Sequence, residues 1–322
     1  YLAEAIDILS DMYLNASIEK DEFERERLVV LQEVKMSDDE PDSVAAENLS
    51  RLLFPGNAVG LPVTGSEDVL AALKKSEMRE YHRASYVPAA TVAALVGRFN
   101  PSSALKMIED ALESLPQGAP RAFKRVRKTR KLPENFAKVH RDVKEAQLAL
   151  GFRTFGAKDA RRYAFSVFDT MMGRGMTSRL FQRIREKAAL SYDIHSSAQL
   201  FDDTGFWGVF GGINAAKLPK AIDLVRKELD LIKSKMPAKA EVKHVKDFMT
   251  GNFRLGLERQ QTRLLHCIAG AVTFGRIVPV SEVVENIEAV TQEDVLAVAN
   301  AVIDENLMAT SLVLPSQIGN QE

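Results

Sequence analysis

The stretch from Asp21 to Asp42 constrains the fold of this chain most strongly, because its pattern predicts a single long helix. Proline disfavours helical geometry in the residue before it, so the helix is expected to end in the cluster Ser37-Asp38-Asp39-Glu40-Pro41. Glu26 and Glu33 stand seven residues apart in this stretch, which puts both carboxylates on one helix face about two turns apart.

The face that carries Glu26 and Glu33 also carries Val29 and Val30, so we expect it to point partly inward. An inward carboxylate needs a cation, a metal ion or hydrogen bonds. The alternative is an ordinary solvated face, since this helix is heavily charged. The pattern therefore indicates a binding site at Glu26 and Glu33 but does not identify what the carboxylates bind.

Composition excludes several classes of protein. The 322 residues are enough for two domains, and 46% hydrophobic with 27% charged residues is ordinary globular composition. A net charge of −1 argues against nucleic acid or an anionic membrane as the main partner. Cys267 is the only cysteine, so neither an intramolecular disulfide nor a cysteine zinc site is expected. No apolar run approaches the ~18 residues of a membrane span.

The first residues already follow a helical pattern, with Leu2, Ile6, Leu9 and Tyr13 on one face. We therefore expect the sequence to be a fragment whose N-terminal part is missing. None of the five histidines lies within a helical turn of another, so the chain cannot form a paired-histidine zinc face.

Irregular alternation of strands and helices favours the α+β class over a doubly wound parallel sheet. Strands are expected at 91–96, 145–152, 192–200, 205–211 and 307–314, with 192–211 forming a hairpin. Leu95–Asn100 and Val209–Asn214 share a similar strand-turn-helix plan, which suggests two related halves. The basic, proline-punctuated stretch between Pro116 and Pro133 is expected to be a solvated linker, with nucleic-acid binding as the alternative.

Two blocks of this sequence resemble the insulinase and mitochondrial-processing-peptidase family of zinc peptidases. The first is Glu26-Arg27-Leu28-Val29-Val30-Leu31-Gln32-Glu33-Val34, followed by Asp39-Glu40-Pro41-Asp42 and Leu61-Pro62-Val63-Thr64-Gly65. In that family an upstream helix carries His-x-x-Glu-His, which supplies two zinc ligands and the general base. The resemblance makes Glu33 the third Zn²⁺ ligand and Glu26 a supporting glutamate.

The second block is Gly175-Met176-Thr177-Ser178-Arg179-Leu180-Phe181, followed by Arg185-Glu186-Lys187-Ala188-Ala189-Leu190-Ser191-Tyr192. It looks like the family segment whose arginine and tyrosine reach the substrate, which here are Arg185 and Tyr192. A guanidinium and a phenol can hold a peptide carbonyl and stabilise the oxyanion that forms on it. Many members have glycine where this chain has Ala189. The alternatives are a surface ion pair of Arg185 with Glu186 and ordinary strand packing of Tyr192.

The resemblance implies two structurally similar α+β domains, each a mixed β-sheet packed with helices, which form a clam-like pair around an extended peptide. We expect residues 1–116 to be the remainder of the N-terminal domain, 117–136 a linker and 137–322 the C-terminal domain. The implied activity is that of a zinc endopeptidase, inactive here because the His-x-x-Glu-His segment is absent. The alternative is a non-catalytic partner or scaffold subunit, and either a homodimer or a heterodimer with a related subunit is possible.

Overall fold

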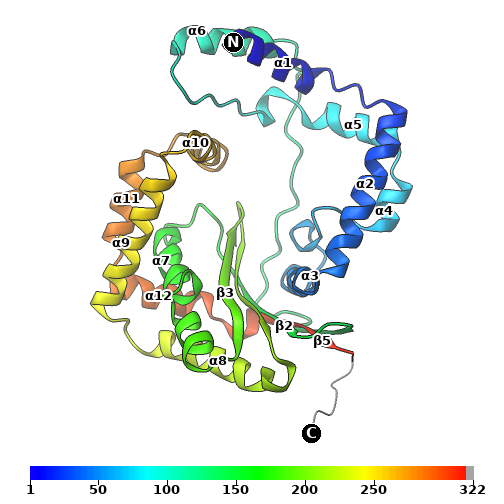
Figure 1. Cartoon of the computed structure of the whole chain (residues 1–322). Coiled ribbons are helices and arrows are strands. Elements are labelled where there is room, and N and C mark those ends of the chain that lie inside the picture. Colours follow the sequence, from blue (N-terminus) through cyan, green and yellow to red (C-terminus); the bar gives the residue numbers. More distant parts are fainter. Residues whose placement is uncertain (317–322) are drawn as a thin grey trace. The chain divides into compact units, whose positions relative to one another are not determined.

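The computed structural model describes residues 1–316 (Figure 1). Their contacts divide the chain into two compact units. Unit 1 contains Tyr1–Lys35, Val63–Phe123 and Leu257–Val278. Unit 2 contains Met36–Pro62, Lys124–Gly256 and the residues from Pro279 onward. Met36–Pro62, which the sequence assigned to the first domain, thus packs in unit 2; the limits 1–116, 117–136 and 137–322 stay a prediction for the intact protein.

Unit 1 is built from helices. These are α1 (Leu2–Leu14), most of α2 (Lys20–Asp39), α4 (Glu67–Ala72), α5 (Lys75–Ser85), α6 (Pro101–Leu112) and α10 (Gln260–Phe274). The long helix expected from the sequence is α2, and it ends where the proline predicted. Pro41 is the first residue of α3 (Pro41–Leu53), a position where the missing N–H of proline costs no hydrogen bond.

The buried strand expected at Thr91–Val96 is not formed, so this prediction was wrong. The run follows a short 3₁₀ turn, η2 (Pro88–Ala90), and stays irregular and partly exposed, with Val92 45% exposed. Instead of joining a ladder, the Thr91 hydroxyl donates to the carbonyl of Val87 at 2.8 Å. A strand requires a neighbour for its backbone groups, and none of the strands within residues 1–316 lies beside this run.

Unit 2 contains one mixed sheet of five strands in the order β1-β5-β2-β4-β3. β1 and β5 are parallel, and the other pairs are antiparallel. The strands are β1 (Phe136–Arg141), β2 (Ala146–Thr154), β3 (Ser191–Leu200), β4 (Gly205–Ile213) and β5 (Met308–Pro315). The hairpin and the last strand were predicted from the sequence, whereas β1 was not. β3 lies at one edge of the sheet (Figure 1).

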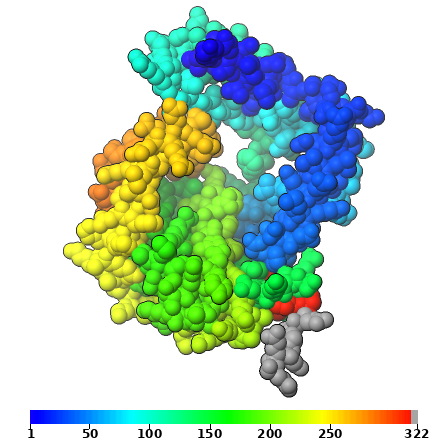
Figure 2. All heavy atoms as spheres, viewed as in Figure 1, coloured from blue at the N-terminus to red at the C-terminus, as the bar shows by residue number. Residues whose placement is uncertain are grey.

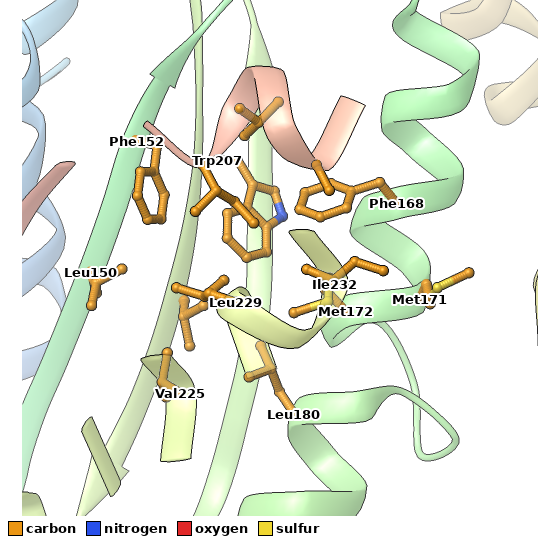
Figure 3. Close-up of a cluster of buried hydrophobic side chains, with 14 of the residues drawn as sticks. Leu150, Phe152, Phe168, Met171, Met172, Leu180, Trp207, Val225, Leu229 and Ile232 are labelled. Carbon is orange, nitrogen blue, oxygen red and sulfur yellow. The ribbon is translucent and has the colours of Figure 1, made fainter. Parts of the chain in front are cut away.

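Both faces of β2 are buried, and its alternate residues serve two different cores. Leu148, Leu150 and Phe152 belong to one core with Trp207 and with residues of helices α7 (Arg162–Gly173), α8 (Leu218–Ser234) and α12 (Gln292–Val302). Figure 3 shows Leu150 and Phe152 near Trp207 in this core. Ala149 instead belongs to the core under α3. At Gly151 a Cβ atom would lie 3.0 Å from the Leu49 side chain of α3, so glycine allows that helix to approach the sheet closely.

A buried carboxylate ties α7 to the sheet. Asp169 of α7 is almost fully buried and accepts hydrogen bonds from Ser196 Oγ at 2.6 Å and from Trp207 Nε1 at 2.8 Å. Arg174 Nε also donates to it. A buried charge is tolerated only with such partners, so this network fixes the position of α7 on β3 and β4.

The remaining helices of unit 2 are α9 (Lys239–Gly256) and α11 (Val280–Ala289). α7 packs against α9, and both are visible on the face shown in Figure 2, in green and yellow. Helices and strands alternate irregularly around a mixed sheet, which confirms the α+β class. No helix within residues 1–316 is long and apolar enough to cross a membrane.

Candidate functional site

The face of α2 that carries Glu26 and Glu33 is exposed, so the expected inward orientation is not observed. Both carboxylates are exposed, and Val29 between them is 45% exposed. Val34 is the residue that α2 buries. The two glutamates therefore project from the helix toward solvent, although Val30 on the same face is partly buried.

Arg27 fixes the orientation of α2 within unit 1. Its Nη1 donates to the carbonyls of Leu70 and Ala71 at 2.8 Å, and its Nη2 donates to the carbonyl of Leu73 at 2.6 Å. These carbonyls lie at the C-terminal end of α4, where the last backbone oxygens of a helix lack partners. The arginine satisfies them, and the glutamate face on α2 stays free.

Glu33 by itself does not fit a metal ion. A catalytic zinc site takes about three protein ligands. Within residues 1–316 no group of three or more histidine, cysteine, aspartate or glutamate side chains is placed to hold a metal ion. The donor is of a suitable type, since zinc binds glutamate oxygens, but the described residues do not complete the set.

Arg185 lies on η3 (Phe181–Lys187), a π-helix. Neighbouring Arg183 anchors η3 through an ion pair with Glu228 of α8 at 2.9 Å, and that carboxylate is buried. Arg185 itself is exposed, with its guanidinium carbon 4.7 Å from the centre of the Phe181 ring. The surface ion pair with Glu186 is not formed. π-helical turns occur often at functional sites.

A left-handed residue ends η3. Ala189 has φ +49°, a conformation that favours glycine. Its N–H donates to the carbonyl of Arg185 at 3.2 Å, and the N–H of Leu190 donates to the carbonyl of Ile184 at 3.0 Å. Many members of the family that this sequence resembles carry glycine at this position. The left-handed backbone gives a physical reason for that preference.

Tyr192 is the extra residue of a β-bulge at the start of β3. Ser191 pairs with Ile213 and Asp193 pairs with Gly212, which leaves Tyr192 without a partner residue. A bulge redirects a side chain relative to the regular alternation of a strand. Tyr192 is 82% exposed, so the alternative of ordinary strand packing does not hold within unit 2.

The residue that secures this bulge, Ser191, was not found from the sequence. Its Oγ donates to the carbonyl of Gly212 at 2.7 Å and accepts from the N–H of Asp193 at 3.2 Å. The opposite strand makes room, because a Cβ on Gly211 would lie 2.4 Å from the carbonyl oxygen of Asp193. Paired glycines inside the strand sequence were the available signal, since they often mark a bulge or a close backbone approach.

Two protein-family models match this chain, and the four candidate site residues lie in the matched regions. The family model described as "Insulinase (Peptidase family M16)" matches residues 1–67, and the one described as "Peptidase M16 inactive domain" matches residues 72–249. The first match contains Glu26 and Glu33, and the second contains Arg185 and Tyr192.

Similar proteins carry related names. The chain is 29% identical to an uncharacterized zinc protease of Streptomyces coelicolor over 93% of its own length and 66% of that protein. It is 31% identical to an uncharacterized zinc protease of Mycobacterium tuberculosis over 96% of its own length and 71% of that protein. The crystal structure of a protease from Helicobacter pylori shares the fold, with a TM-score of 0.87, 19% identity and coverage of 98% and 76% of the two chains.

Proposed function

Since this chain belongs to the insulinase family of peptidases, family M16, we propose that it forms part of a zinc-dependent endopeptidase. In the intact protein Glu33 would supply one zinc ligand and Glu26 would support it. Zinc, when bound, would act as a Lewis acid on a peptide carbonyl. Its other ligands and the general base would come from a His-x-x-Glu-His segment outside these residues.

Arg185 and Tyr192 are proposed to hold the substrate. A guanidinium and a neutral phenol are poor metal ligands beside histidine and carboxylate, but both are good donors to an oxygen that gains negative charge. The observation that supports this role most strongly is the bulge at Tyr192, which leaves this residue without a partner on β4 and its phenol 82% exposed. A hydroxyl so placed is available to a bound peptide.

The test uses the intact protein and a matched pair of variants on α2. Glu33→Gln should remove bound zinc and peptide cleavage together, because an amide is a much weaker zinc ligand than a carboxylate. Glu22→Gln is the control: its ion pair with Arg25 is exposed on both sides, so zinc content and cleavage should remain at the wild-type level. Normal zinc content in Glu33→Gln would contradict the ligand assignment.

A second candidate is a non-catalytic partner subunit that presents substrate to an active companion. The observation that favours it is the match of residues 72–249 to a domain described as inactive. The same measurements separate the two candidates. Intact wild-type protein that neither binds zinc nor cleaves peptides alone, but stimulates a related subunit, would favour the partner.

A further inference from the structure

The residues from Lys124 to Lys131, here called the basic segment, form an ordered surface feature of unit 2. The segment has no regular secondary structure, and the side chains of six basic residues are exposed along it. These residues are Lys124, Arg125, Arg127, Lys128, Arg130 and Lys131. The sequence predicted a solvated linker here, and the side chains are indeed solvated.

The backbone of the basic segment, by contrast, is held in place. Asn57 Nδ2 donates to the carbonyl of Lys124 at 3.2 Å, and the N–H of Val126 donates to Asp203 Oδ2 at 2.9 Å. Arg153 Nη2 donates to the carbonyl of Arg127 at 3.0 Å. Just beyond the segment Leu132 is buried in the core under α3. The basic side chains therefore extend from a fixed main chain.

None of the six basic side chains has a carboxylate within 4.0 Å in the described part of the chain. Some other basic residues of unit 2 are paired, as Arg179 is with Glu241 at 2.7 Å. Like charges fixed close together repel one another and raise the free energy of the folded chain. A bound anion would relieve that repulsion.

The basic segment lines one side of a cavity of about 800 Å³ in unit 2. The other side consists of Phe54–Asn57 and Arg153, and no acidic residue lines it. Burial lowers the pKa of Arg153, but an arginine guanidinium remains charged at neutral pH. The carboxylate of Asp203, which accepts from the N–H of Val126, is one negative charge near the seven lysine and arginine side chains that line the cavity. The cavity is thus concave and positively charged.

We propose that this cavity binds an acidic stretch of polypeptide in an extended conformation. Carboxylates spaced along an extended chain can pair with cations spaced along an irregular segment of similar length. Single-stranded nucleic acid fits less well, because it relies on exposed aromatic rings for stacking, and Phe54, the ring in this cavity, is 1% exposed. A flat anionic membrane fits a concave surface poorly. The proposal concerns binding and is independent of peptide cleavage.

The experiment measures binding of a fluorescein-labelled oligoglutamate peptide of about eight residues, which matches the basic segment when extended. The chain of 322 residues is used as it is. Lys124→Gln/Arg125→Gln/Lys128→Gln should weaken binding roughly 10- to 100-fold, because each exposed ion pair contributes about two- to fivefold. The matched control, Lys220→Gln/Lys235→Gln/Lys239→Gln, removes three exposed charges elsewhere in unit 2 and should leave affinity within about twofold.

A third variant keeps the charge and loosens the segment. Asn57→Ala removes the hydrogen bond to the carbonyl of Lys124, so affinity should fall by less than in the triple variant, since an array that is not preorganised binds more weakly. The proposal would be overturned if the peptide did not bind, or if the control triple variant lost as much affinity as the variant in the basic segment. It would also be overturned if an oligonucleotide or anionic vesicles bound more tightly than the peptide.

Discussion

At the scale of single residues, Tyr192 offers the sharpest test of the proposed site. Its side chain is exposed at a bulge, so Tyr192→Phe should change the free energy of unfolding by less than about 0.5 kcal/mol. If the phenol donates to the substrate oxyanion, turnover by the intact enzyme should fall by about 10²–10³, with zinc content unchanged. Steady-state cleavage of a fluorogenic peptide and metal analysis provide the two readouts.

The control for this substitution is Tyr81→Phe in unit 1, where another exposed tyrosine lies against Arg121 with no proposed contact to substrate. Its turnover should match that of the wild type. Wild-type turnover in Tyr192→Phe would mean that the phenol takes no part in the reaction, and the role of Arg185 would then lose its support.

At the scale of elements, the end of η3 predicts a stabilising substitution. A left-handed conformation costs a non-glycine residue about 1–2 kcal/mol, whereas glycine adds unfolded-chain entropy worth about 0.4–1 kcal/mol. Ala189 has φ +49°, so Ala189→Gly should raise the free energy of unfolding by about 0.5–1 kcal/mol, as measured by urea denaturation. The neighbouring residue Ala188 has a right-handed backbone conformation, with φ −100° and ψ −14°. Ala188→Gly should therefore lower the free energy of unfolding by about 0.5–1 kcal/mol. Similar losses in both variants would show that the turn is not strained at Ala189.

At the scale of the whole molecule, the described residues supply one carboxylate of the proposed zinc site, so this chain alone should neither retain stoichiometric zinc nor cleave peptides. Elemental analysis after dialysis tests this directly. One tightly held zinc per chain, lost in Glu33→Gln, would show that the chain already contains a complete site.

The intact gene gives a second whole-molecule prediction. We expect His-x-x-Glu-His on a helix about 70–80 residues before Glu33, a spacing taken from the family resemblance. Sequencing the coding region upstream of Tyr1 checks it. A gene without this motif would favour the partner subunit.

Leu95–Asn100 contains no strand, unlike Val209–Asn214, so the expected similarity of these two runs was wrong at the strand; the order of elements before Thr91–Val96 instead resembles that before β5. The helices α8 to α12 lead through the 3₁₀ turn η5 (Glu305–Leu307) into β5, and α1 to α5 lead likewise through η2 toward Thr91–Val96. The last helix before each run also begins in the same way. At the start of α5 the Glu77 carboxylate accepts a hydrogen bond from the N–H of Lys74, and at the start of α12 the Asp294 carboxylate accepts one from the N–H of Thr291. β5 is a strand because β1 and β2 pair with it on both sides. Thr91–Val96 has the composition of a strand without such neighbours in the described residues.

Features that depend on local chemistry could be predicted from the amino-acid sequence. Hydrophobic periodicity and proline placed α2 and its end, and alternation placed β2 and the β3–β4 hairpin. Glu26, Glu33, Arg185 and Tyr192 were selected as candidates by two short motifs, which needed no tertiary information.

Features that depend on contacts between distant residues could not be predicted from the sequence. The bulge at Tyr192 requires Ser191 and Gly212, which lie on two different strands. The backbone of the basic segment is held by Asn57, Arg153 and Asp203. α3 packs closely on the sheet at Gly151. Each of these arrangements combines residues far apart in the chain. Periodicity reports which way a side chain faces along its own element, but whether another element covers that face, or pairs with that strand, is settled by packing.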